Sequence, residues 1–266
     1  MSASALKGTA LITGASTGIG AVYADRLAKR GYDLILVARS PEKLSEVAAR
    51  LEATGQSIET IAADLTRKED VQRVAERLRT DATITALVNN AGVASVSKLL
   101  DAKIEDLESM INLNVTALTQ LALAALPGFV ARKSGLLINI ASVVALAPEL
   151  LNGTYSGTKA YVVNFTQALQ NEVEGKGVTV QAVLPGATAT PLWEKAGRPV
   201  EHLPAEIVMS AEEMVDASLA GLDQHELITI PSLPDIADWE KFEEARKALG
   251  PNLSRRKPAA RYGIHS

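Results

Sequence analysis

Short, mostly apolar runs alternate along this chain with longer segments in which apolar residues recur every three or four positions. The run Leu34–Ala38 is all apolar and lacks the polar alternation of a strand with one face in water, so it predicts a strand covered on both faces. Strand and helix in strict alternation predict a parallel sheet with helices on both sides, a doubly wound α/β fold. The predicted strands are Thr9–Thr13, Leu34–Ala38, Ile58–Ala62, Ile84–Val88, Leu136–Ile140, Val178–Val183 and Leu227–Ile230, about seven in all.

The helices predicted between these strands have recognisable ends, such as Gly31 after the first helix and Pro41 at the start of the second. Two later helices, Ile104–Leu126 and Asn152–Glu174, carry apolar side chains almost all round. This pattern predicts burial on two sides, one facing the sheet. The other side faces either a partner subunit or another part of the same chain. The remaining predicted helices are Ile19–Lys29, Pro41–Ala53 and Lys68–Arg79.

No repeat or linker divides the chain, so residues 1–266 are predicted to form a single domain. Residues 186–210 hold three prolines and Trp193 without a clear period. They follow a strand at its carboxyl end, where open α/β sheets bind ligands, and are predicted to form a substrate loop. Residues 235–266 form a C-terminal extension with an amphipathic segment, Trp239–Leu249, and the basic run Arg255-Arg256-Lys257. This extension is expected to cover the pocket or to dock on a neighbouring subunit.

Composition excludes several classes of function. The net charge of −4 offers no strong basic field, so we expect no nucleic-acid partner. The absence of cysteine excludes disulfides and thiolate catalysis. The only histidines, His202, His225 and His265, are scattered, so no metal site is expected.

Membrane and export signals are also missing from the pattern. The start, Met1–Lys7, has no charged region followed by an apolar run, so no signal peptide is evident. The most apolar stretch, Val115–Val130, is short for a bilayer span and is interrupted by Pro127-Gly128. The sequence therefore predicts a soluble, cytoplasmic protein without membrane contact.

The stretch Tyr155-Ser156-Gly157-Thr158-Lys159 lies within a predicted helix. Four residues make about one helical turn, so Tyr155 and Lys159 project from one face. A tyrosine loses its proton near about pH 10, and a cation beside it favours the phenolate. The pair is therefore a candidate general acid and base, although taken alone it could be an ordinary surface pair.

A glycine-rich turn, Thr13 to Gly20, joins the first strand to the first helix. Its glycines let the backbone approach a diphosphate, and the helix N-terminus offers free N–H groups. The spacing Gly-x-x-x-Gly-x-Gly differs from Gly-x-Gly-x-x-Gly, and a plain tight turn is the alternative.

Taken together, these motifs resemble the short-chain dehydrogenase/reductase family, in its shorter single-domain branch. The resemblance covers about residues 6–230 and implies a Rossmann-like, dinucleotide-binding fold. It also implies reversible hydride transfer between a carbonyl and an alcohol. The matching positions are Thr13 to Gly20, Asn89-Asn90-Ala91-Gly92, Asn114, Ser142, Tyr155 with Lys159, and Pro185-Gly186.

The resemblance assigns catalytic roles to four residues. Tyr155 is the acid and base, and Ser142 bonds the substrate oxygen. Lys159 lowers the tyrosine pKa and binds the nicotinamide ribose, while Asn114 holds a water in a proton relay. A helix cap for Ser142 and a structural bridge to the neighbouring strand for Asn114 are the alternatives.

The resemblance also implies the cofactor contacts. Asp64 would bond the adenine amino group, and Thr188 and Thr190 would hold the nicotinamide carboxamide. The full set is Gly14, Ser16, Thr17, Gly18, Ile19, Gly20, Arg39, Ser40, Asp64, Leu65, Asn90, Ala91, Gly92, Tyr155, Lys159, Pro185, Gly186, Thr188 and Thr190.

Cofactor preference depends on Ala38-Arg39-Ser40, after the second strand. An acid here would bind the adenosine 2′-hydroxyl and repel a 2′-phosphate. This chain has no acid at Ala38, and Arg39 is a cation suited to phosphate. Thr17 stands where the family often has a second basic residue, so NADP is expected with NAD as the alternative. An arginine exposed to solvent is the plainer interpretation.

The sequence thus predicts an NADP-dependent carbonyl/alcohol oxidoreductase and a homo-oligomer, either dimer or tetramer. Apolar residues expected at the pocket favour an apolar ketone: Val93, Val144, Leu150, Leu151 and Trp193. A catalytically silent NADP-binding regulator is one alternative. An epimerase or dehydratase of the longer branch is another, and the turn spacing and short tail argue against it.

Overall fold

The computed structural model describes residues 7–264; residues 1–6, on which the signal-peptide expectation partly rests, and His265 and Ser266 lie outside the described residues. Seven parallel strands form one sheet in the order β3-β2-β1-β4-β5-β6-β7. The predicted doubly wound, Rossmann-like fold is confirmed. The strands are β1 Thr9–Thr13, β2 Asp33–Ala38, β3 Ile58–Ala62, β4 Ile84–Asn89, β5 Gly135–Ile140, β6 Val178–Val183 and β7 Ile228–Thr229.

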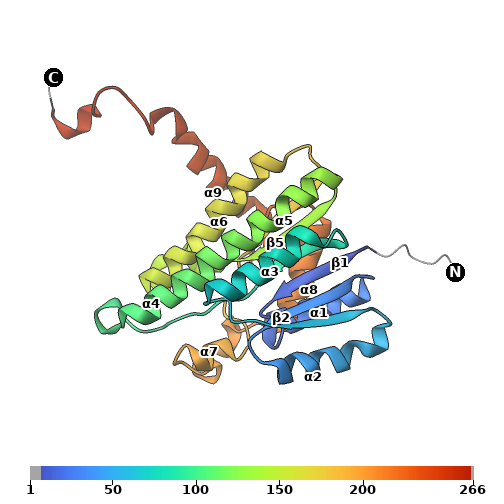
Figure 1. Ribbon diagram of the computed structural model, residues 1–266. Helices are drawn as coiled ribbons and strands as arrows, with labels where there is room; N and C mark the ends of the chain where they lie inside the picture. Colours follow the sequence, from blue (N-terminus) through green and yellow to red (C-terminus); the bar gives the residue numbers. More distant parts are fainter. Residues whose placement is uncertain (1–6, 265–266) are drawn as a thin grey trace. The chain divides into compact units, whose positions relative to one another are not determined.

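Helices cover both faces of the sheet (Figure 1). On one face lie α1 Gly18–Lys29, α2 Pro41–Leu51 and α8 Ala211–Asp223. On the other lie α3 Lys68–Thr80, α5 Leu118–Arg132 and α6 Gly153–Val173. The shorter helices are α4 Ile104–Ile111, the π-helix Asn112–Ala117 and α7 Leu192–Lys195. The 3-10 turns are Glu52–Thr54, Leu99–Asp101, Val143–Ala145, Pro148–Leu150, Val200–His202, Ala205–Ile207, Gly250–Asn252 and Ala260–Tyr262.

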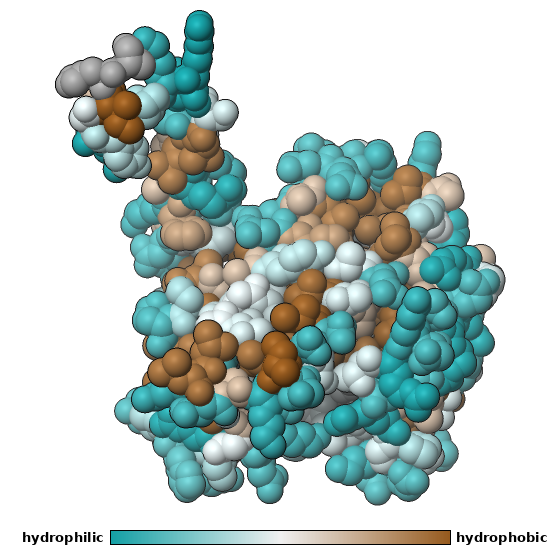
Figure 2. Space-filling view, turned by 60° about the vertical axis from the view of Figure 1, so that its left-hand side comes forward, coloured by the Kyte–Doolittle hydropathy of each residue, from teal (hydrophilic) through white to brown (hydrophobic). Residues whose placement is uncertain are grey.

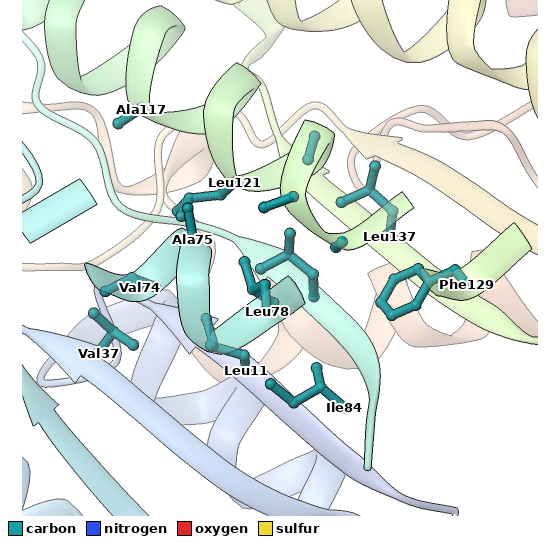
Figure 3. Close-up of a cluster of buried hydrophobic side chains, with 14 of the residues drawn as sticks. Leu11, Val37, Val74, Ala75, Leu78, Ile84, Ala117, Leu121, Phe129 and Leu137 are labelled. Atoms are coloured by element: carbon teal, nitrogen blue, oxygen red, sulfur yellow. The ribbon is translucent and has the colours of Figure 1, made fainter. Parts of the chain in front are cut away.

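Successive residues of each central strand enter opposite cores. Leu11 packs with Val74, Leu78 and Leu121 on the α3 and α5 side (Figure 3). Its neighbour Ile12 packs on the side of α1 and α8. Because both faces of the sheet are covered here, the central strand β2 is apolar from Leu34 to Ala38 with no polar alternation.

The segment from Ile104 to Arg132 is one continuous helical stretch of 29 residues. The expectation that Pro127 interrupts it is wrong, because Ala125 and Phe129 pack into the core on either side of the proline. By length and composition this is the one stretch among the described residues that could cross a membrane, and half of its apolar window is buried inside the protein. Such burial is typical of the core helix of a folded domain.

The two-sided burial expected for α5 and α6 is largely supplied by the chain itself. Leu118, Leu121 and Ala122 are buried, whereas Leu123 is 68% exposed on the outer face. On α6, the ring of Tyr161 stacks on Phe165 with centroids 5.6 Å apart, and the hydroxyls of Thr119 and Tyr161 lie 2.8 Å apart.

By its internal contacts, the chain forms two compact units, residues 1–231 and 232–266. Helix α8 was not predicted, although its capping box is readable at Ser210 and Glu213, where each side chain bonds the other's backbone N–H. The second unit contains α9 Ile236–Ala248, capped by Asp235.

Candidate active site

The carboxyl ends of β1, β4, β5 and β6 lie at the same edge of the sheet. The strand order reverses between β1 and β4, since β2 and β3 lie beyond β1 while β5 to β7 lie beyond β4. In open α/β sheets this reversal creates the crevice that binds ligands. The residues singled out in the sequence belong to the loops at this edge and to the helices that carry Asn114, Tyr155 and Lys159.

The glycine-rich turn packs so closely on itself and on Asn90 that a side chain at Gly20 would collide with it. A Cβ atom built on Gly20 would lie 2.4 Å from the carbonyl oxygen of Gly14 and 2.5 Å from Nδ2 of Asn90. Gly14 and Gly18 have φ values of +66° and +54°, which suit glycine. The backbone N–H groups at the start of α1 follow directly, and Thr17 provides no side-chain cap for them. The turn therefore fits the diphosphate of a dinucleotide.

Thr13 and Asn90 fix this turn to the neighbouring strand. Oγ1 of Thr13 accepts hydrogen bonds from the backbone N–H groups of Asn90 and Ala91, both at 3.0 Å. In return, Nδ2 of Asn90 donates to the carbonyl oxygen of Thr13 at 2.9 Å. Asn90 thus supports the turn in this structure, and Thr13 acts with it.

The catalytic candidates meet where β5 ends and α6 begins. The side-chain oxygen of Asn152 accepts from the backbone N–H groups of Thr154 and Tyr155, which fixes the first turn of α6. Ser142 follows β5 and lies buried, its hydroxyl donating to the carbonyl oxygen of Pro185 at 3.3 Å. Nζ of Lys159 donates to the carbonyl oxygen of Ile140 at 2.9 Å and lies 5.8 Å from the centre of the Tyr155 ring.

Burial dominates the electrostatics of the pair. It raises the pKa of Tyr155 to about 12, against a smaller lowering by a hydrogen bond with Ser142. Burial also lowers the pKa of Lys159 to about 8. Burial therefore outweighs the lowering of the tyrosine pKa that was expected from Lys159, whose ammonium donates to the carbonyl oxygen of Ile140. The phenol holds its proton at neutral pH and is set up as an acid.

Asn114 makes the bridge that was weighed for it as an alternative. Its side chain accepts from the backbone N–H of Val93 at 3.0 Å and donates to the carbonyl oxygen of Val93 at 2.9 Å. It also donates to Oγ1 of Thr158 at 3.1 Å, next to Lys159. A Cβ on Gly92 would lie 3.1 Å from Oδ1 of Asn114 and 3.6 Å from Nζ of Lys159. Asn114 sits in a π-helix, an irregularity common at functional sites.

An apolar wall surrounds the phenol. Tyr155 packs with Val144 and Met110, and with the partly buried Val93 and Leu151. Of the other side chains expected at this pocket, Leu150 is exposed. The indole N–H of Trp193 donates to the carbonyl oxygen of Thr188 at 3.0 Å, which anchors the substrate loop.

The same loop closes against the glycine-rich turn. A Cβ on Gly18 would lie 3.0 Å from the methyl carbon of Thr190. The hydroxyl of Thr188 donates to the carbonyl oxygen of Gly186 at 3.2 Å, so its lone pairs are available to a donor such as a carboxamide.

The ends of β2 and β3 carry the remaining candidates. Arg39 is exposed, and the hydrogen bonds and ion pairs of residues 7–264 include none from its guanidinium. The hydroxyl of Ser40 caps α2 and donates to Glu42 at 2.8 Å. Asp64 accepts from the backbone and side chain of Thr66 through Oδ1. The side chain of Leu65 is buried in the core, so only its backbone could meet a cofactor.

A chain of buried amides beneath the site was not anticipated. Nδ2 of Asn89 donates to Oδ1 of Asn139 at 3.0 Å, and Nδ2 of Asn139 donates to the hydroxyl of Thr166 at 2.9 Å. This chain joins β4, β5 and α6 directly below Ile140 and Lys159. Polar residues inside apolar strands were the signal that could have revealed it.

Comparison with known proteins places this geometry in context. A family model described as short chain dehydrogenase matches residues 8–201. A short-chain dehydrogenase from Sphingobium yanoikuyae, solved in complex with NADPH, is 47% identical with a TM-score of 0.92 and covers 95% of this chain and 98% of its own. A bulky-bulky ketone specific alcohol dehydrogenase from Comamonas testosteroni is 41% identical with a TM-score of 0.88, covering 96% and 98%.

Among curated proteins, 17-beta-hydroxysteroid dehydrogenase type 3 of Homo sapiens is 36% identical over 214 residues. The match covers 79% of this chain and 66% of the human protein. The chain thus spans slightly less than two thirds of the length of that relative.

Proposed function

Since the chain belongs to the short-chain dehydrogenase family, we propose that it is an NADP-dependent oxidoreductase that interconverts a bulky apolar ketone and its alcohol. The observation that carries the proposal is the buried Tyr155 phenol, which lies in an apolar wall beside Ser142 and Lys159. Solved relatives that are described as complexed with NADPH and as specific for bulky ketones support the cofactor and the substrate class.

In the reductive direction, bound NADPH supplies the hydride. Tyr155 donates its proton to the carbonyl oxygen, so that carbon gains a hydride and oxygen a proton. The hydroxyl of Ser142 donates a hydrogen bond to the same oxygen and stabilises the charge that develops on it. Because the site excludes water, these contacts are stronger than they would be in solution.

Lys159 and Asn114 act behind the tyrosine. The Lys159 ammonium stabilises the tyrosinate left after proton transfer, and its pKa of about 8 lets it exchange a proton near neutral pH. Asn114 donates hydrogen bonds to the backbone of Val93 and to the hydroxyl of Thr158. The bond to Thr158 fixes the turn of α6 that carries Tyr155 and Lys159. Its role in a relay to water is part of this proposal.

Cofactor binding is assigned to the glycine-rich turn and the loops at the sheet edge. The glycine-rich turn and the α1 N-terminus would hold the diphosphate, and Arg39 the 2′-phosphate. Asp64 would bond the adenine, and Thr188 and Thr190 the carboxamide. The free guanidinium of Arg39 favours NADP over NAD.

We also infer a homo-oligomer in the cytoplasm. The outer faces of α5 and α6, with Leu123 exposed, are a surface for a second copy. The burial of half of the Ile104–Arg132 window favours a place for this helix inside the domain and not in a membrane. Light scattering in solution tests the assembly, and a mass of 28.1 kDa at micromolar concentration would argue against it.

The function is tested by following NADPH oxidation with a panel of ketones. We expect turnover with diaryl or steroid ketones, weak turnover with acetone and none with ketose sugars. NADPH binding without turnover of any ketone would favour a silent regulator. A preference for sugars would contradict the apolar pocket.

A further inference from the structure

The end of the chain is basic, whereas the rest is acidic. Of the 27 Lys and Arg residues, six follow Glu244, where there is no Asp or Glu. The other 21 stand against all 31 acidic residues. Arg246 pairs with Glu243 at 2.8 Å, but the ion pairs of the described residues include none from Arg255, Arg256 or Lys257. These three cations are available to an acidic partner.

The same segment, residues 232–264, also presents apolar side chains that are exposed to solvent. None of the described residues after Pro231 is buried. Phe242, Leu249 and Leu253 follow one another at the spacing of one side of a helical segment, and Leu253 is 76% exposed. The ring of Trp239 packs against that of Phe242, with ring centroids 5.4 Å apart. An exposed series of large apolar residues, rimmed by cations, is typical of an interaction surface.

A surface of the opposite charge borders the active site. We call it the α4 patch: the exposed residues Leu99, Leu100, Ile104 and Ile111, interleaved with Asp101, Glu105, Asp106 and Glu108. Leu100 is 96% exposed, and two lysines, Lys98 and Lys103, leave the patch with an acidic excess. Figure 2 shows one face of the molecule, on which hydrophobic residues gather in patches bordered by hydrophilic ones.

The α4 patch is attached to the catalytic helix. Nδ2 of Asn152, the cap of α6, donates to the carbonyl oxygen of Ser97 at 2.6 Å. Met110 of α4 packs against Tyr155. Whatever covers the patch therefore lies next to the segments that contact Tyr155 and cap α6.

We propose that the C-terminal segment of one copy docks on the α4 patch of a second copy, and that two copies exchange these segments reciprocally. The α4 patch and the C-terminal segment are complementary: each presents exposed apolar residues, and the patch is acidic whereas the segment is basic. We call the C-terminal segment the arm. A two-fold pair needs one α4 patch and one arm on each copy, and this chain carries both. Helix α9 has 13 residues and is about 20 Å long, enough to lie across a helix face.

The proposal concerns assembly and stands on observations independent of the reaction. It predicts that each arm lies against the α4 segment that contacts its neighbour's Tyr155. Since the chain has no cysteine, single introduced cysteines report this contact directly. We would co-express Leu253→Cys and Ile104→Cys chains with tags of different size, and cross-link them with a short bis-maleimide.

Cross-linked heterodimers are expected at least tenfold above a control pair of Leu253→Cys and Lys43→Cys, since Lys43 is exposed on α2. Adding Arg255→Glu, Arg256→Glu and Lys257→Glu to the arm should lower the yield to the control level. Adding Glu105→Lys, Asp106→Lys and Glu108→Lys to the patch of the partner should then restore it. The arm variants change no buried residue, so NADPH binding should be unaffected.

A heterodimer yield no higher than the control would overturn the proposal. A further variant that carries both Leu253→Cys and Ile104→Cys on one chain tests the alternative: cross-linking confined to that chain would also overturn the proposal, because the arm would then fold back on its own copy. A heterodimer yield that the Arg255→Glu, Arg256→Glu, Lys257→Glu variant leaves unchanged would show that opposite charges do not hold the arm on the α4 patch, and would contradict the proposal. The protein could instead sediment with phosphatidylserine vesicles, lose this binding in the Arg255→Glu, Arg256→Glu, Lys257→Glu variant, and show no cross-linking between copies. That result would also overturn the proposal and assign the arm to a membrane surface.

Discussion

At the scale of single residues, the site depends on two buried groups, Tyr155 and Lys159, whose pKa values burial shifts in opposite directions. Burial stabilises the neutral phenol of Tyr155 and the neutral amine of Lys159, so the pKa of one rises and the pKa of the other falls. The sequence predicted the pair from its spacing, which depends only on helix geometry. It could not predict the pKa directions, because these depend on how much water the rest of the fold excludes.

Lys159 makes the stability of the fold depend on pH. Its folded pKa of about 8 lies below the ordinary value of 10.5. Between these values the unfolded chain keeps a proton that the folded chain has lost, so the free energy of unfolding rises with pH. Relative to Lys159→Met, the wild type should gain on the order of 2 kcal/mol from pH 7 to pH 10.

Urea unfolding of both proteins at the two pH values measures this difference. Lys43→Met, which removes an exposed ammonium, is the control and should follow the wild type. Equal pH slopes for wild type and Lys159→Met would mean that the Lys159 ammonium is solvated in the folded protein.

Arg39 is expected to set the cofactor preference. A guanidinium–phosphate contact is worth about 1.5–3 kcal/mol per hydrogen bond before solvent screening. Arg39→Leu should therefore weaken NADPH binding roughly ten- to a hundredfold and leave NADH nearly unchanged. Adding Ala38→Asp should reverse the preference, because the new carboxylate accepts from the ribose hydroxyl and repels phosphate.

The measurement is the ratio of the Kd values for NADPH and NADH. Arg50→Leu, at the far end of α2, is the matched control, since it removes the same charge away from the sheet edge. A ratio that Arg39→Leu leaves unchanged would remove the main support for NADP.

At the scale of elements, the sequence predicted most boundaries to within one or two residues. Asn152 immediately before α6 and Pro41 at the start of α2 are local signals. Such signals depend only on neighbouring residues, so tertiary packing does not change the boundary that they predict. The failures involve tertiary packing. Pro127 reads as a break, yet contacts of the flanking turns with the sheet keep the helix intact to Arg132.

The missing helix is explained in the same way. Helix α8 has its cap at Ser210, directly after an irregular loop rich in proline, and the loop obscured it. Strand β7, by contrast, was predicted at Leu227–Ile230 and is one residue shorter at each end, Ile228–Thr229. The hydrogen bonds of Asn114 to Val93 join elements 21 residues apart, and spacing alone cannot choose between a bridge and a relay.

The glycine-rich turn gives a prediction at this scale. Gly20→Ala places a methyl group within 2.4 Å of the Gly14 carbonyl oxygen, so the turn must shift. We expect at least a tenfold loss of NADPH affinity and a stability loss of about 1–3 kcal/mol. Gly153→Ala, whose Cβ would meet nothing within 4 Å, should change neither. Isothermal titration and urea unfolding measure both; an unaffected Gly20→Ala protein would show that the turn is loose.

At the scale of the whole molecule, the fold class followed from the alternation of apolar runs and helical segments, because a parallel sheet must be covered on both faces. The order of strands and the reversal between β1 and β4 did not follow from that pattern. They place the loops after β1, β4, β5 and β6 at one edge, and so bring distant motifs into one site.

The long apolar helix yields a prediction about the whole protein. Because half of the Ile104–Arg132 window is buried within the domain, we expect the full-length chain in the supernatant after high-speed centrifugation of a detergent-free cell lysate. An integral membrane marker in the same sample provides the control. A chain that pellets with membranes and is released only by detergent would contradict the proposed cytoplasmic location.

The central claim is that Tyr155 is the proton donor in an NADPH-dependent ketone reduction. The most direct measurement is the single-turnover rate with a bulky ketone in wild type, Tyr155→Phe and Tyr161→Phe. Tyr161 lies on the same helix, where its hydroxyl meets Thr119 on the outer side. Loss of an acid/base group should lower the rate about 10²–10⁴-fold in Tyr155→Phe with the NADPH Kd unchanged, while Tyr161→Phe keeps the wild-type rate. A Tyr155→Phe protein that reduces the ketone at the wild-type rate would contradict the account.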